Sequence, residues 1–165
     1  LGGSEYLKVL HHREQGSPPF LSLETEKALH DFILKAIREG VVQSAHDCSD
    51  GGLSIALAEC CVSASDARRG AVVRLPLDTL RRDALLFGES QSRVVLSVKP
   101  EMADQILNRA WDSGIPAMKI GTVGGDRFVI DVEKGQWSEG CRIDLPVDQL
   151  HDRWAFSIER TLNQA

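Results

Sequence analysis

The sequence lacks the features of a membrane or exported protein. No apolar run approaches the roughly 20 residues that a membrane-spanning helix needs. No segment combines the charged start, apolar centre and small-residue end of a signal peptide. A basic stripe is also absent, because the formal net charge is −5 and the acidic and basic residues are interspersed. The sequence therefore predicts neither a membrane nor a nucleic acid as partner.

Cysteine is scarce and has no metal-binding spacing. The four cysteines form no C-x-x-C pair and accompany no paired histidine motif, which argues against zinc. They are Cys48, Cys60, Cys61 and Cys141. Cys60 and Cys61 are neighbours in an apolar segment and are expected to be small core residues. This usage predicts a reducing, cytoplasmic compartment.

Three common catalytic motifs are missing as well. There is no G-x-x-x-x-G-K-[ST] phosphate loop, no G-x-G-x-x-G after a strand and no G-x-S-x-G nucleophile elbow. His46 and Cys48 are close in sequence, but such proximity does not activate a thiol by itself. No complete catalytic site is therefore predicted, and no residue is assigned as catalytic.

What is present is the composition of one soluble domain. The chain has 165 residues, of which 42% are hydrophobic. A chain of this length can bury enough apolar surface to fold without disulfides or a structural metal. Helical and strand-like segments alternate, which predicts an α+β or α/β fold, with helices packed on a mixed β-sheet. The chain begins at Leu1 rather than Met, so we expect a piece of a longer protein.

The periodicity of apolar residues predicts the individual elements. Ser22 is expected to cap the second helix, and Gly124-Gly125-Asp126 is expected to close a hairpin. The strand that Val41 and Val42 lead into and the strand at 94–98 are both expected to be buried. Helices are expected at 5–10, 23–39, 79–86, 101–113 and 147–162, and one is expected from the glycine pair at 51–52 to about residue 64. Strands are expected at 71–75, 94–98, 117–123, 127–132 and 141–145, and one is expected after Val41 and Val42, before the polar turn.

The first candidate site is the strand-to-helix turn in Ala45-His46-Asp47-Cys48-Ser49-Asp50-Gly51-Gly52-Leu53. The amides of a helix N-terminus and the two glycines favour a phosphate. Asp47 and Asp50 are also of the type that binds Mg²⁺ together with phosphate oxygens, although the sequence assigns no metal ligands. The alternative is that Ser49 or Asp50 only caps the helix and Asp47 only stabilises the turn.

The second candidate site is Glu89-Ser90-Gln91, within Phe87-Gly88-Glu89-Ser90-Gln91-Ser92-Arg93. An acid, a hydroxyl and an amide in consecutive loop positions are suited to polar ligand groups. The alternative is an ion pair of Glu89 with Arg93 or Arg82 and a turn made by Ser90.

These two stretches closely resemble phosphoribosylformylglycinamidine synthases, the amidotransferase-linked ligases of purine biosynthesis. Further agreement lies in Gly2-Gly3-Ser4-Glu5-Tyr6-Leu7, in Ile120-Gly121-Thr122-Val123-Gly124-Gly125 and in the segment from Leu145-Pro146-Val147 to Trp154. The resemblance covers nearly the whole chain. It implies an ATP-dependent conversion of formylglycinamide ribonucleotide to its amidine, with Mg²⁺ and with ammonia from a glutaminase subunit or domain.

The resemblance also implies a division of the chain. Residues 1–21 correspond to an irregular lead, the tail of a preceding N-terminal-type domain and a linker, and 22–165 to a C-terminal-type domain like that of aminoimidazole ribonucleotide synthase. The polar tail at 160–165 favours the second of two tandem copies. The preceding domains of the same chain would supply most nucleotide and metal ligands, so the isolated chain is expected to be inactive and to bind no cofactor tightly.

The residues expected to bind substrate or phosphate are Asp47, Ser49, Asp50, Gly51, Gly52, Glu89, Ser90 and Gln91. Two alternatives stay open. One is a domain of another ATP-dependent enzyme of the superfamily, such as aminoimidazole ribonucleotide synthase, selenophosphate synthetase or thiamine-monophosphate kinase. The other is a non-catalytic module whose two turns are only caps.

Overall fold

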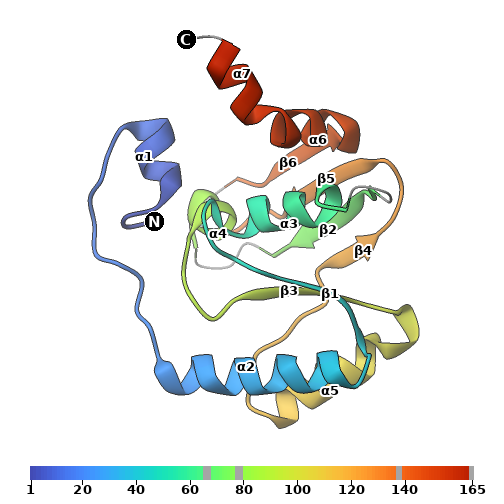
Figure 1. The fold of residues 1–165 in the computed structure, drawn as a ribbon. Coiled ribbons are helices and arrows are strands. Elements are labelled where there is room, and N and C mark those ends of the chain that lie inside the picture. The colour runs from blue at the N-terminus through green and yellow to red at the C-terminus, as the bar shows by residue number, and fades with distance from the viewer. Residues whose placement is uncertain (65–67, 77–79, 137–138, 164–165) are drawn as a thin grey trace. The chain divides into compact units, whose positions relative to one another are not determined.

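The computed structural model describes residues 1–64, 68–76, 80–136 and 139–163, and within these ranges the fold is α+β (Figure 1). The helices are α1 (Glu5–His11), α2 (Leu23–Arg38), α3 (Gly52–Val62), α4 (Arg82–Phe87), α5 (Ala103–Asp112), α6 (Val147–Ala155) and α7 (Ser157–Asn163), with a 3₁₀ turn η1 (Pro100–Met102) before α5. The strands are β1 (Val42–Asp47), β2 (Ala71–Leu75), β3 (Val94–Val98), β4 (Gly121–Val123), β5 (Arg127–Val132) and β6 (Cys141–Pro146).

The chain divides into two compact units. The first comprises Leu1–Ala56 and Asp83–Lys119, and the second comprises Leu57–Arg82 and Ile120–Ala165. The division falls inside α3 and α4, so both candidate site stretches lie in the first unit.

The first unit is built on an antiparallel ribbon of β1 and β3, with α2 and α5 along one side of it (Figure 1). The core consists of Ala36 from α2, Val41 before β1 and Ile106 from α5. As expected, Ser22 caps α2, because its side chain accepts from the Thr25 amide. This capped helix and the short apolar core position β1 and its following turn.

The expected burial of β1 and β3 is wrong. Residues 43–45 and Asp47 of β1 are exposed, and every residue of β3 is half-buried. Near-continuous apolar residues predict burial only where both faces of a sheet are covered. In the described residues this sheet has two strands, so much of its surface stays open.

The second unit is built on a mixed four-stranded sheet of order β4-β2-β5-β6. β2 runs parallel to β5 and antiparallel to β4, and β6 runs antiparallel to β5. Alternate residues of β2 point to a buried face, as strand geometry requires. Val73 and Ile130 pair across β2 and β5 and are 2% and 0% exposed, so they mark the centre of this core.

The expected hairpin between 117–123 and 127–132 is wrong. The first of these strands begins only at Gly121, and it pairs with β2 rather than with β5. Gly124 and Gly125 do turn the chain, but their main-chain groups bond to Gly70, which leads into β2. β2 therefore lies between the two strands that local turn chemistry appeared to join.

The expected C-terminal helix 147–162 is two helices. α6 ends at Ala155, the backbone of Phe156 leaves the helical region, and α7 begins at Ser157. Trp154, Ile158 and Leu162, whose spacing would place them on one face of a single helix, are 47%, 75% and 72% exposed. The residue of α6 that is buried is Val147.

The remaining elements agree with the sequence to within a few residues. α4 begins at Arg82, and the start of the helix expected from Thr79 lies outside the described residues, as does part of the tail at 160–165. The helix expected at 101–113 is divided into η1 and α5. Among the described residues, no helix has both the length and the apolar character needed to cross a membrane.

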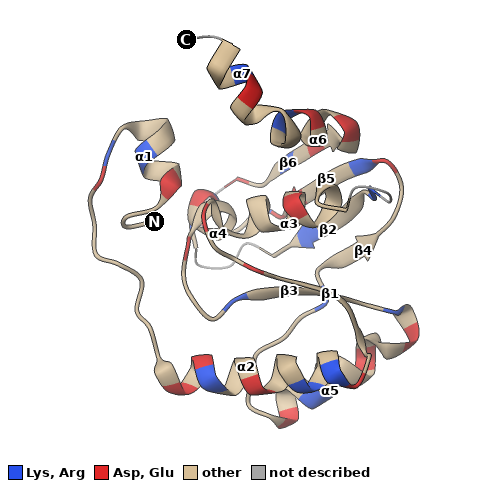
Figure 2. Ribbon diagram, viewed as in Figure 1, with Lys and Arg blue, Asp and Glu red and all other residues tan. Residues whose placement is uncertain are grey.

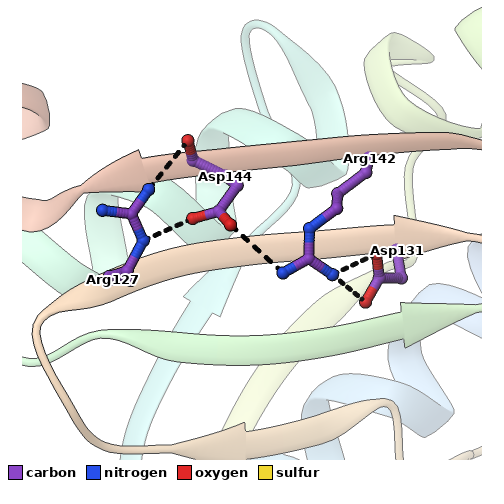
Figure 3. Close-up of polar contacts among 4 residues, drawn as sticks. All are labelled: Arg127, Asp131, Arg142 and Asp144. Carbon is purple, nitrogen blue, oxygen red and sulfur yellow. Dashed lines mark hydrogen bonds and ion pairs between the residues drawn. The ribbon is translucent and has the colours of Figure 1, made fainter.

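Charged residues of both signs are interspersed along α2 and along the β5–β6 pair (Figure 2). On β5 and β6 they form a ladder, in which Arg142 donates to Asp131 at 2.7 and 2.8 Å and to Asp144 at 3.1 Å (Figure 3). The guanidinium of Arg127, followed by that of Arg142, lowers the pKa of the Asp144 carboxyl. These side chains are partly solvated, so the ladder favours the β5–β6 register more than it stabilises the fold.

Candidate functional site

The first candidate stretch is a tight turn between β1 and α3. Gly51 and Gly52 have φ angles of 77° and 68°, which L side chains rarely adopt. A Cβ on Gly52 would lie 2.5 Å from the carbonyl oxygen of Gly88 and 2.8 Å from the carbonyl carbon of Phe87. The glycine pair therefore allows the two candidate stretches to pack backbone against backbone.

Glu89 joins the two stretches by hydrogen bonds. One of its carboxylate oxygens, Oε1, accepts from the Gly51 amide at 2.7 Å and from the Glu5 amide at 2.9 Å. Among the described residues, neither Arg82 nor Arg93 pairs with this carboxylate, so the ion pair that was the alternative to a ligand site is not formed. One of the amides that the sequence assigned to a phosphate is thus already bound to a carboxylate.

Arg93, which the sequence offered only as an ion-pair partner, and Ser92, which it did not single out, hold the loop around Glu89. The Arg93 guanidinium donates to the carbonyls of Gly88 and Ser90, on either side of Glu89. The Ser92 hydroxyl donates to Glu26 of α2, and Ser92 itself has a φ of 60°. Because Arg93 lies next to the loop in the sequence, its contact with the loop could have been predicted. Nothing in the sequence connects Glu26 with Ser92, which is 66 residues away.

Gln91 is the candidate residue with an uncommitted side chain. It is exposed, and its amide has no polar partner within the described part of the chain. Ser90 is half-buried, and its carbonyl is held by Arg93. The loop thus presents Gln91 outward on a backbone that is tied on both sides of Glu89.

Asp47 and Ser49 form a small polar pair at the end of β1. The Ser49 hydroxyl donates to the Asp47 carboxylate at 2.5 Å, and this bond is the main cause of the lowered pKa of Asp47. Asp47 and Asp50 are both exposed, so the turn presents two carboxylates to solvent. Among the residues that the structure describes, no group of three or more His, Cys, Asp and Glu could hold a metal ion.

His46 and Cys48 do not form a nucleophile pair. Nδ1 of His46 lies 2.7 Å from the main-chain oxygen of Asp47. Cys48 is 8% exposed, and burial raises the pKa of its thiol. A buried thiol with a raised pKa is a poor nucleophile. All four cysteines are free thiols.

An open groove of about 440 Å³ lies beside Asp47 in the first unit. Its walls come from α2, β1 and β3 and are mainly apolar, and their polar side chains are His30, His46 and Asp47. The lining residues are His30, Ile33, Leu34, Ile37, Ala45, His46, Asp47 and Val94.

The model of the family "AIR synthase related protein, C-terminal domain" matches residues 1–133. The chain belongs to this family. The match spans both candidate stretches, so the turn at 47–52 and the loop at 89–91 are parts of an AIR synthase-related C-terminal domain.

Within this family, the chain is similar to proteins named PurL. The phosphoribosylformylglycinamidine synthase subunit PurL of Anaeromyxobacter sp. (strain Fw109-5) is 41% identical over 171 residues, which cover 99% of this chain and 21% of that protein. A structure of T. maritima PurL complexed with FGAR is 26% identical, with a TM-score of 0.61 over 76% of this chain and 21% of that chain. A structure of the same protein complexed with ATP is 25% identical, with a TM-score of 0.59 over the same shares. The chain thus spans about a fifth of the length of the PurL proteins that it matches.

Proposed function

We propose that this chain serves as a C-terminal-type domain of a PurL-like synthase, an ATP-dependent ligase of purine biosynthesis. The observation that carries the proposal is the 41% identity to a PurL subunit over 99% of the chain. The reaction is the conversion of formylglycinamide ribonucleotide to its amidine, with ammonia derived from glutamine. The T. maritima PurL structures with FGAR and with ATP support these two ligands.

The proposed role of the domain is to form one wall of a ligand cleft. Gln91 offers an uncommitted amide, and Asp47 and Asp50 offer exposed carboxylates. An Asp carboxyl with the ordinary pKa of 3.8 is already ionised at neutral pH, and the lowered pKa of Asp47 is consistent with that charged form, which a Mg²⁺ ligand needs. Preorganised polar groups of this kind are the main protein contribution to phosphoryl transfer.

The residues proposed to line the cleft fall into two groups. Asp47, Ser49, Asp50, Ser90 and Gln91 carry polar groups that a ligand can contact, and Gly51, Gly52 and Glu89 shape the turn that presents them. Further domains of the longer chain would supply the remaining ATP and Mg²⁺ ligands, and a glutaminase subunit or domain would supply ammonia. The compartment is proposed to be cytoplasmic, since free thiols are typical of reducing compartments.

The structural alternative is favoured by one observation. Glu89 is bound to two main-chain amides, which is what a capping role requires. If the whole of both stretches serves only to cap and turn, then the domain is a non-catalytic half of the synthase.

The test of the proposed function is an assay for amidine formation. The full-length protein that carries this chain is incubated with formylglycinamide ribonucleotide, ATP, Mg²⁺ and an ammonium salt, and the amidine and released phosphate are measured. We expect turnover that depends on all four components, and none from the 165-residue chain alone. No turnover by the full-length protein, or full turnover by the chain alone, would contradict the proposal.

A further inference from the structure

Glu89 connects three segments that are far apart in the sequence. Its Oε1 atom accepts from Gly51, which is 38 residues away, and from Glu5, which is 84 residues away. A carboxylate oxygen has lone pairs for two donors, and a hydrogen bond to a charged group is stronger than one between neutral groups. Oε1 of Glu89 thus accepts two hydrogen bonds, and both come from the protein itself.

Both donors lie where a helix begins. Glu5 is the first residue of α1, and Gly51 directly precedes α3. Amides at these positions lack partners within the helix, and a negative charge there is favoured by the helix dipole. One side chain therefore satisfies one amide at each of two helix starts, in addition to the Ser4 side chain that caps α1.

The same junction has further contacts on both sides. The ring of Tyr6 in α1 stacks on Phe87 with centroids 4.8 Å apart and an angle of 8° between planes. Arg93 holds the carbonyls of the two residues that flank Glu89. α1 has no buried residue of its own, so these contacts to Phe87 and Glu89 are what attach it to the loop.

We propose that Glu89 is a positioning residue that ties α1 and the turn before α3 to the loop that carries Gln91. It does so through its two amide bonds and makes no contact with a ligand. This inference rests on the proposed function for the role of Gln91, but the junction itself does not depend on any reaction. Glu89 sets where Gln91 and Asp47 stand relative to each other, because Gly51 lies on the Asp47 side of the junction.

The experiment compares Glu89→Ala, Glu89→Gln and Glu89→Asp in the full-length protein, with Glu101→Ala as the matched control at an exposed glutamate. Amide hydrogen exchange is followed in the peptides that contain Glu5 and Gly51. Glu89→Ala is expected to speed exchange by about tenfold or more in both, since a hydrogen bond to a charged group is lost at each. Glu89→Gln keeps an oxygen acceptor and is expected to stay within about threefold of the unaltered protein. Glu101→Ala is expected to change neither peptide.

Turnover gives a second readout. Glu89→Ala is expected to raise KM for the ribonucleotide about tenfold with kcat changed less, and Glu89→Gln to restore most of the loss. Loss of turnover in Glu89→Gln as large as in Glu89→Ala, with unchanged exchange, would overturn the inference, because the charge would then act on a ligand. If Glu89→Ala does not fold, Glu89→Asp serves as the test. Its shorter side chain is expected to lose the hydrogen bond from at least one of the two amides, so exchange should become faster in at least one peptide. Unaltered exchange in both peptides would overturn the inference. If the unaltered protein has no turnover, only the proposed function fails, and the exchange data still test the junction.

Discussion

Gln91 and Glu89 lie two residues apart in one polar loop, yet the fold uses them differently. The Glu89 carboxylate is bound to two amides, whereas the Gln91 amide is exposed with no polar partner in the described part of the chain. The sequence places acid, hydroxyl and amide side by side but cannot assign these roles, because the amides that bind Glu89 are 38 and 84 residues away. The Ser22 cap was predictable because its acceptor and donor lie three residues apart.

Gly52 tests the backbone packing of the two stretches. Gly52→Ala is expected to lower the free energy of unfolding by about 3 kcal/mol, because a left-handed alanine costs about 1–2 kcal/mol and its Cβ would also meet the Gly88 backbone. Gly114→Ala is the matched control: its φ is 72°, but a Cβ there meets nothing within 4 Å. It is expected to cost only about 1 kcal/mol. Urea unfolding measures both, and equal losses would contradict the close packing at Gly52.

Asp47 tests the polar pair at the end of β1. Its pKa in the folded protein is lowered, mainly by the Ser49 hydroxyl, from an ordinary value of 3.8. A group with a lowered folded pKa stabilises the fold above its unfolded pKa, and this contribution disappears as the pH falls through the folded pKa. Ser49→Ala is therefore expected to raise the Asp47 pKa toward 3.8, and the contribution from Asp47 should shrink. Carboxyl NMR titration measures this, and an Asp47 pKa that does not respond to the change would contradict the pairing.

At the scale of elements, the periodicity of apolar residues located most helices and strands. It could not show which strands pair with each other in the sheets. Residues 124–126 have the composition of a hairpin turn, and they do turn the chain. Nothing local could indicate that β2, some 50 residues earlier in the sequence, pairs with both neighbouring strands. Likewise, the apolar spacing of 147–162 fits one helix, while the break at Phe156 divides it.

β2 tests the assignment of the core face in the second unit. Val73→Ala is expected to lower the free energy of unfolding by about 2–3 kcal/mol, from lost burial at about 0.8 kcal/mol per methylene and from the cavity left behind. Val72 is next in the strand but 43% exposed, against 2% for Val73. Val72→Ala is therefore expected to cost about 0.5 kcal/mol or less. Equal effects of the two changes in denaturant unfolding would contradict the register of β2 with β5.

At the scale of the whole molecule, the chain is two compact units, where its length alone suggested one domain. These two units are not the same as the division into residues 1–21 and 22–165, which concerns where a preceding domain ends. That division stays a prediction. Both candidate stretches fall in the first unit, so the proposed ligand groups and the Glu89 junction belong to one compact body. The family match through residue 133 includes that body completely.

The central claim is that Gln91 contacts a ligand of the synthase, and one measurement tests it most directly. Amidine formation by the full-length protein is compared for Gln91→Ala and for Gln105→Ala, an exposed glutamine on α5. Gln91→Ala is expected to lower kcat/KM by about 100-fold, or roughly 2.7 kcal/mol of transition-state stabilisation, with an unchanged melting temperature. Gln105→Ala is expected to change neither. Near-normal turnover of Gln91→Ala would contradict the claim and assign this domain a structural role.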